Sequence, residues 1–204
     1  MAGERGRTGE RRRASVHRKT RETDIRLTLD LDGSGSYQVE TGVPFFDHML
    51  ESFAKHGLLD LELAASGDLA VDLHHTVEDV GITLGQAVRE ALGDATGIRR
   101  YGSQLLPMAE AKVEVALDVS NRPYLVYRVP LEHRMIGSFD ASLAEDFLYA
   151  FAHNAGLDLH VELRYGKSPH HVVEAIFKGV ARALRIALEI DPRGVGLPTV
   201  KGAL

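Results

Sequence analysis

The chain has 204 residues, enough for one substantial domain or for two small units that share a core. Its content of 44% hydrophobic and 26% charged residues is ordinary for a globular protein, and no apolar run reaches the roughly 18 residues of a membrane helix. The lack of cysteine excludes disulfides and thiolate ligands, and a net charge of -5 argues against a general nucleic-acid binder. We therefore expect no nucleic-acid or membrane partner and, with no secretion signal visible, a cytoplasmic location.

The first 21 residues are basic, with eight Arg or Lys and no apolar stretch. We interpret residues 1–17 as a flexible, solvated tail, the usual behaviour of charge-rich chain ends. A nucleic-acid-binding arm is less favoured, because no Phe, Tyr or Trp is interleaved with the basic residues. Glu4 and Glu10 argue against an organelle transit peptide, since such peptides are poor in acidic residues.

The spacing of apolar residues predicts the same order of elements in both halves of the chain. The first half is predicted to contain strand, strand, helix, strand and long helix at residues 25–31, 37–41, 45–56, 58–65 and 74–92. The second strand is expected to return from a turn at residues 32–36. The second half is predicted to repeat this order at residues 113–119, 124–129, 142–154, 157–163 and 170–190. Ser142 is predicted to be an N-cap.

The repeated order indicates a tandem duplication, with residues 18–97 as the first half and residues 98–204 as the second. Residues 48–54 (HMLESFA) align with residues 146–152 (DFLYAFA), which supports this reading. No low-complexity linker separates the halves, so we expect them to share one core. The predicted fold is α+β, with two sheets packed on two long helices.

Each predicted long helix begins with the pattern His-His-x-x-Glu. The copies are His74-His75-x-x-Glu78 and His170-His171-x-x-Glu174, and they lie 96 residues apart. Residues four apart share a helix face, whereas adjacent His side chains diverge by about 100° and more naturally serve two different ions. One copy alone is more often an exposed polar helix start. Two copies in equivalent places favour two metal ions bound by imidazole and carboxylate, a mixture that suits Mn or Fe.

Three segments carry a resemblance to the imidazoleglycerol-phosphate dehydratase family of histidine biosynthesis. They are residues 45–50 (FFDHML), 72–79 (DLHHTVED) and 170–178 (HHVVEAIFK), within a resemblance that runs from about Arg18 to Leu204. The resemblance implies a fold similar to ribosomal protein S5 domain 2 and a 24-subunit shell with active sites at subunit contacts. It also implies two Mn²⁺ ions per active site.

The reaction that the resemblance implies is dehydration of D-erythro-imidazole-glycerol phosphate to imidazole-acetol phosphate. The proton to be removed lies beside no carbonyl group, so it has no ordinary acidifying neighbour. A metal-bound imidazolate is a strong electron donor that can expel hydroxide and give a diazafulvene-like intermediate. Loss of the adjacent proton then gives an enol, which tautomerises to the ketone.

The resemblance also implies roles for single residues. The implied metal ligands are His48, His74, His75, Glu78, Asp146, His170, His171 and Glu174, with Asp146 in the place of the usual His. A carboxylate can still bind Mn²⁺, so Asp146 can substitute for it. The implied catalytic residues are Glu22 as acid or base, together with His74, Glu78, His170 and Glu174.

The implied substrate-binding residues are Glu22, His56, Arg100, Arg122, Lys178, Thr199 and Lys201. Arg residues suit a phosphate because they can donate two hydrogen bonds to it. The chain departs from the family pattern at Thr199, which replaces the usual Ser, and at the neighbouring Val200, which replaces a Thr. A third is Ala109 in place of Asp, and the neighbouring Glu110 is the candidate to compensate for it.

Two other functions remain open from the sequence. A phosphatase or hydrolase that uses two metal ions is one, although the chain lacks an Asp-rich cluster of the phosphatase kind. A non-catalytic shell that stores metal is the other, and Ala109 and Asp146 are the residues that keep it open. Turnover, and the identity of the product, separate these alternatives from the dehydratase.

Overall fold

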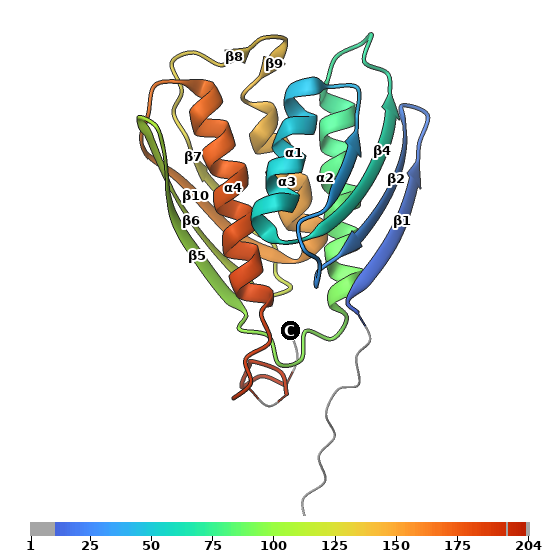
Figure 1. Ribbon diagram of the computed structural model, residues 1–204, viewed down its shortest axis with the longest axis vertical. Helices are drawn as coiled ribbons and strands as arrows, with labels where there is room; N and C mark the ends of the chain where they lie inside the picture. The colour runs from blue at the N-terminus through green and yellow to red at the C-terminus, as the bar shows by residue number, and fades with distance from the viewer. Residues whose placement is uncertain (1–10, 195, 203–204) are drawn as a thin grey trace, which may run out of the picture.

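The computed structural model describes residues 11–194 and 196–202, and they form two four-stranded sheets with four helices between them (Figure 1). The strands of the first sheet are β1 (Arg13–Lys19), β2 (Thr23–Asp30), β3 (Tyr37–Glu40) and β4 (Asp60–Gly67). Those of the second are β5 (Tyr101–Met108), β6 (Ala111–Val119), β7 (Tyr124–Arg128) and β10 (Leu157–Tyr165). The helices are α1 (Pro44–Gly57), α2 (His74–Leu92), α3 (Leu143–Ala155) and α4 (Pro169–Leu188). Strands β8 (Met135–Ile136) and β9 (Phe139–Asp140) form a small hairpin.

The two sheets have the same topology, which confirms the predicted α+β tandem repeat. Their strand orders are β1-β2-β4-β3 and β5-β6-β10-β7. In the first sheet β4 is antiparallel to β2 and parallel to β3. The strand predicted to return at residues 37–41 therefore exists, but it pairs with β4 and makes no pair with β2. In the second sheet β10 lies between β6 and β7 in the same way, antiparallel to β6 and parallel to β7.

The prediction of a flexible tail over residues 1–17 is wrong for residues 13–17, which belong to β1. This strand pairs with β2 along its whole length, from Arg13 opposite Asp30 to Lys19 opposite Asp24. Ala14 and Val16 pack against the core, while Arg13, His17 and Lys19 are exposed on the other face of this edge strand. Alternation along an edge strand thus accounts for a basic sequence in a sheet. Residues 1–10 of the predicted tail lie outside the described part of the chain.

Each long helix packs on the sheet of its own half and on the short helix of the other half. Helix α2 covers the first sheet and contacts α3, whereas α4 covers the second sheet and contacts α1. The α2–α3 contact is close, because a Cβ atom at Gly81 or Gly85 would lie 2.6 Å from a carbonyl oxygen of α3. Aromatic rings from both halves meet in the core, as in the 5.8 Å contact of Phe53 with Phe151. Both helix pairs therefore combine residues from the two repeats.

Two helix starts differ in how they are capped. Ser142 occupies the predicted N-cap position of α3, but its side chain makes no capping hydrogen bond. The carboxylate of Asp140 instead accepts the backbone N–H of Ser142 at 2.8 Å. Ser168 caps α4, because its hydroxyl accepts the backbone N–H of His171 at 3.4 Å. Within the described residues, no helix is long and apolar enough to cross a membrane.

Candidate active site

The two His-His-x-x-Glu motifs occupy the first turns of α2 and α4, at the same end of the molecule (Figure 1). Because α1 packs on α4 and α3 packs on α2, residues of the short helices lie beside these first turns. Each motif thereby gains a neighbour from the other repeat, and two clusters of possible metal ligands result.

The first cluster joins His48 of α1 to His170 and Glu174 of α4. One ligand atom from each of the three residues lies within 4.8 Å of the others. His170 Nε2 is 3.1 Å from Glu174 Oε2, and His48 Nε2 is 3.7 Å from Glu174 Oε1. The ring of Phe45 packs edge-on against His170 with centroids 5.1 Å apart, which restricts the orientation of the imidazole. Two imidazoles and one carboxylate at this spacing can bind a divalent transition metal.

Glu174 is the buried anion of this cluster, with its side chain 8% exposed. Burial by itself raises the pKa of Glu174, but the hydrogen bond and charge of Lys178, with the nearby His48 and His170, bring it below its usual value. Lys178 Nζ lies 2.6 Å from Glu174 Oε1. Lys178 therefore contacts a proposed metal ligand, a contact that the sequence analysis did not foresee.

The second cluster joins Asp146 of α3 to His74 and Glu78 of α2. His74 Nδ1 lies 3.3 Å from Asp146 Oδ2, and His74 Nε2 lies 3.8 Å from Glu78 Oε2. The two carboxylates face different nitrogens of one ring, so this cluster is less convergent than the first. Asp146 nevertheless occupies the place in this cluster that His48 occupies in the other, as the alignment of residues 48–54 with 146–152 predicts.

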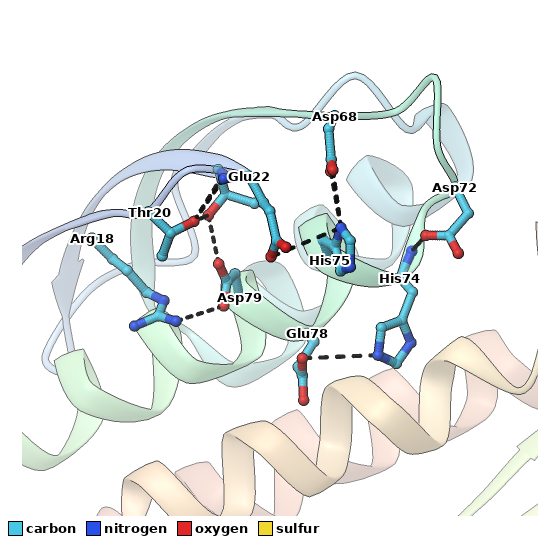
Figure 2. Close-up of polar contacts among 10 residues, drawn as sticks. Arg18, Thr20, Glu22, Asp68, Asp72, His74, His75, Glu78 and Asp79 are labelled. Atoms are coloured by element: carbon cyan, nitrogen blue, oxygen red, sulfur yellow. Dashed lines mark hydrogen bonds and ion pairs between the residues drawn. The ribbon is translucent and has the colours of Figure 1, made fainter.

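The second His of each motif points away from the first, as expected for adjacent residues on a helix. Ring centroids are 6.2 Å apart for His74 and His75 and 5.9 Å apart for His170 and His171. Figure 2 shows His75 turned toward Asp68 and Glu22 rather than toward Glu78. The hydrogen bond to Asp68 raises the pKa of His75. Within the described chain, His75 and His171 thus belong to neither cluster.

Two carboxylates outside the expected set of ligands and substrate-binding residues accept hydrogen bonds from these outer histidines. Asp68 Oδ2 lies 3.0 Å from His75 Nδ1, and Glu110 Oε2 lies 2.6 Å from His171 Nδ1. Hydrogen bonds from the backbone of Ser168 and from His171 lower the pKa of Glu110 to about 2. Asp68 lies outside every recognisable motif, so only the three-dimensional arrangement reveals it.

Four of the expected substrate-binding residues line one pocket of about 580 Å³. They are Arg100, Arg122, Thr199 and Lys201, beside Ser120, Pro198 and Val200. The guanidinium of Arg100 donates to both carboxylate oxygens of Asp118 at 2.7 and 3.0 Å and to the Pro198 carbonyl at 2.9 Å. These bonds hold Arg100 against the C-terminal segment, and the pocket presents cations suited to a phosphate.

This pocket and the two ligand clusters lie at opposite ends of the molecule. The backbone N–H of Arg100 bonds to the carbonyl of Ala187, near the end of α4, whereas His170 lies at its start. At 1.5 Å per residue, the 17 intervening steps of helix correspond to about 26 Å. Figure 1 shows α4 running from the end where both long helices begin to the end where the C-terminal segment lies. A small substrate cannot span it within one chain.

The other expected substrate residues lie away from the pocket. His56, near the end of α1, lies close to the cations Lys178 and Arg182, and its burial, with their charge, lowers its pKa. Glu22 lies just before β2, with its carboxylate 3.9 Å from His75 Nδ1 (Figure 2). Ala109, where the resemblance implies Asp, occupies a left-handed backbone conformation with φ of 46° in the β5–β6 turn.

Comparison with known proteins identifies the family. The family model described as imidazoleglycerol-phosphate dehydratase matches residues 41–184. The protein of that name from Desulfitobacterium hafniense is 55% identical over 195 residues, which cover 96% of this chain and 100% of that protein. The one from Symbiobacterium thermophilum is 56% identical over 189 residues, 93% of this chain and 91% of that protein.

Two solved structures support the same assignment. The imidazoleglycerol-phosphate dehydratase of Staphylococcus aureus superposes with a TM-score of 0.80 and 37% identity, covering 88% of this chain and 99% of that one. A Pyrococcus furiosus structure described as IGPD gives a TM-score of 0.81 and 35% identity, with 93% and 100% covered. The resemblance inferred from the sequence motifs is confirmed: the chain belongs to the imidazoleglycerol-phosphate dehydratase family.

Proposed function

We propose that this member of a histidine-biosynthesis dehydratase family converts D-erythro-imidazole-glycerol phosphate to imidazole-acetol phosphate at a site with two Mn²⁺ ions. The observation that carries the proposal is the cluster of His48, His170 and Glu174, which joins the two repeats. Its donors are imidazole and carboxylate without thiolate, the combination that suits Mn²⁺. The family assignment makes dehydration the expected reaction of such a site.

The remaining donors fit a second ion. His74 lies between Glu78 and Asp146, and the outer histidines, His75 and His171, have carboxylate partners at Nδ1 that leave Nε2 free. The ligand side chains other than Glu174 are about one-third to one-half exposed, for example 50% for His48 and 37% for His171. Ligands this exposed can meet ligands from another copy of the chain.

Mn²⁺, when bound, would supply a Lewis acid that favours the deprotonated imidazole ring of the substrate and so increases its ability to donate electrons. The residues of the chain supply positioning and proton transfer. Glu174 remains ionised because Lys178 offsets its burial. Glu22 is our candidate to accept the carbon-bound proton. The hydroxyl and the carbon-bound proton together make up the one water that is lost, and the resulting enol tautomerises to the ketone.

The phosphate group is assigned to the pocket of Arg100, Arg122, Thr199 and Lys201. Because this pocket lies about 26 Å along α4 from the ligand clusters, the complete site needs residues from more than one chain. This separation supports active sites at subunit contacts, and the 24-subunit shell is the assembly that the family resemblance implies. The exposed surface of the metal ligands supports the same arrangement.

Product analysis tests the reaction. The purified protein, incubated with Mn²⁺ and imidazole-glycerol phosphate, is expected to give a product lighter by one water that retains its phosphate. Release of inorganic phosphate would instead identify a two-metal phosphatase. Binding of Mn²⁺ with no change of the substrate would favour the metal-storing shell.

Mixing of inactive variants tests the shared site. Glu22→Gln and Arg122→Ala chains, each with low activity alone, are expected to regain activity when unfolded and refolded together. In mixed shells some sites combine an intact Glu22 from one chain with an intact Arg122 from another. If both residues served one site from a single chain, the mixture would be no more active than its components.

A further inference from the structure

Glu22 and Glu110 occupy the same place in the two repeats. Each is the residue directly before the second strand of its sheet, since β2 begins at Thr23 and β6 begins at Ala111. The two residues are 88 positions apart, as are the aligned strand residues Ile25 and Val113. Each also lies opposite the second His of the motif on the helix that covers its sheet. Symmetry alone would give both carboxylates the same role.

Their contacts show that the roles have diverged. The carboxylate of Glu110 accepts from His171 Nδ1 at 2.6 Å through one oxygen. Its other oxygen accepts the backbone N–H groups of Ser168 at 2.8 Å and Lys167 at 3.3 Å. Both oxygens of Glu110 are thus engaged at the start of α4, whereas Glu22 Oε2 lies 3.9 Å from His75 Nδ1, beyond hydrogen-bond distance.

In the first repeat Asp68 makes the contact that Glu110 makes in the second. Its two carboxylate oxygens lie 3.0 and 3.2 Å from His75 Nδ1 (Figure 2). Gly67 and Gly166 are equivalent, because a Cβ atom at either would meet the first residue of the second strand and the third residue of the His-His-x-x-Glu motif of its repeat (Thr23 and Thr76, or Ala111 and Val172). The counterpart of Asp68 in the second repeat is therefore Lys167, the residue after Gly166. The second repeat thus has a cationic residue where the first has the carboxylate of Asp68.

A carboxylate that accepts the Nδ1–H of an imidazole fixes both the tautomer and the direction of the ring. The other nitrogen, Nε2, then carries the free electron pair that a metal ion needs. In the first repeat Asp68 supplies this carboxylate, so Glu22 retains an oxygen without a short partner. In the second repeat only Glu110 is within hydrogen-bond distance of His171 Nδ1 among the contacts of the described chain.

We propose that Glu110 and Asp68 are positioning residues that hold His171 and His75 for metal binding, and that Asp68 thereby frees Glu22 for proton transfer. The inference rests on the proposed function, because it assigns these histidines to Mn²⁺. It goes beyond that function by assigning Glu110 and Asp68 to the positioning of histidines and Glu22 to proton transfer, although Glu22 and Glu110 occupy equivalent places in the two repeats.

The test measures Mn²⁺ binding and turnover separately on the full-length protein. Binding is followed by the electron paramagnetic resonance signal of free Mn²⁺ during titration of metal-stripped Glu110→Gln, Asp68→Asn and Glu22→Gln. The first two are expected to weaken Mn²⁺ binding at part of the sites by about 10- to 100-fold. Glu22→Gln is expected to keep wild-type Mn²⁺ affinity and to lose kcat. Glu114→Gln is the matched control, because Glu114 of β6 pairs with Arg164 of β10 and contacts none of the proposed metal ligands in the described ion pairs.

Unchanged Mn²⁺ affinity in Glu110→Gln or Asp68→Asn would overturn the positioning role. A loss of affinity in Glu22→Gln as large as in Asp68→Asn would overturn the division of tasks. A third outcome is that the variants change Mn²⁺ affinity as expected but the wild-type protein does not dehydrate the substrate. The positioning role of Glu110 and Asp68 would then stand, whereas the proposed function and the proton-transfer role of Glu22 would fail. A wild-type protein that binds no Mn²⁺ would contradict both.

Discussion

His48 Nε2 and Glu174 Oε1 lie 3.7 Å apart, although the two residues come from different repeats. The contact exists because α1 of the first repeat packs on α4 of the second. The pairing of α3 with α2 brings Asp146 to His74 in the same way. Neither repeat could form either cluster alone, so the duplication is part of the construction of the site.

The loss of His170 should remove metal from the first cluster. In His170→Ala only His48 and Glu174 of this cluster remain, and we expect Mn²⁺ affinity to fall by more than the roughly 10- to 100-fold cost of losing an outer partner. Metal content after dialysis against a fixed concentration of free Mn²⁺ measures the effect. His153→Ala is the control, because its ring Nδ1 bonds to the Tyr149 carbonyl of its own helix. Equal metal content in the two variants would remove His170 from the ligand set.

Arg122→Ala should weaken substrate binding and leave metal binding intact. A charge-assisted hydrogen bond to phosphate contributes about 1.5–3 kcal/mol, which corresponds to an increase in KM of roughly 10- to 100-fold. Steady-state kinetics at saturating Mn²⁺ checks this. Arg128→Ala provides the comparison, since Arg128 is 73% exposed and pairs with Glu162. If KM rises equally in both variants, the pocket of Arg100 and Arg122 is not the phosphate site.

Ala109→Gly should stabilise the protein. Ala109 is exposed and has φ of 46°, a conformation that costs a residue with a Cβ about 1 kcal/mol and that Gly adopts freely. The midpoint of urea unfolding, at one fixed chain concentration, should therefore rise. The same change at Ala116, an exposed position within β6, should lower it by about 0.5–1 kcal/mol in the free energy of unfolding. A decrease in both variants would contradict the conformational argument.

The contribution of Asp60 to stability should depend on pH. Hydrogen bonds from the backbone N–H groups of Ser36 and Ser34 lower the pKa of Asp60 in the folded state. A carboxylate with a lowered folded pKa stabilises the fold above its unfolded pKa, and this stabilisation is lost as the pH falls through the folded value. Asp60→Asn should therefore destabilise the protein by about 1 kcal/mol near neutral pH, a modest value because the group is half-buried and solvent still screens its charge. The difference in unfolding free energy between the two proteins should begin to shrink as the pH falls below about 4 and should vanish only below the folded pKa of Asp60. A constant difference across this range would exclude the charge as the cause.

The sequence was sufficient to predict the repeat, the long helices and the residues at their starts. Apolar periodicity predicts elements whose one face is buried, and α2 has the bounds predicted, His74–Leu92. It failed for β1, whose edge position leaves alternate basic residues in solvent, and for β5, which contains Gly102 and Pro107. Periodicity also carries no information on strand order, so the position of β4 between β2 and β3 could not be predicted.

The candidate site was predictable in composition but not in its contacts. The motifs supplied the histidines and Glu174, and the 100° step between adjacent helix residues predicted that each His pair diverges. The roles of Asp68 and Lys178 depend on loop and helix packing that no local pattern encodes. The same holds for the distance along α4 between the ligand clusters and the phosphate pocket, which is known only once Arg100 is placed beside Ala187.

The most direct measurement is the formation of imidazole-acetol phosphate by metal-stripped protein before and after addition of Mn²⁺. We predict negligible turnover without metal and its recovery with Mn²⁺, which would show that Ala109 and Asp146 are compatible with the dehydratase reaction. No turnover by an intact assembly with bound Mn²⁺ would contradict the proposal and indicate a non-catalytic member of the family.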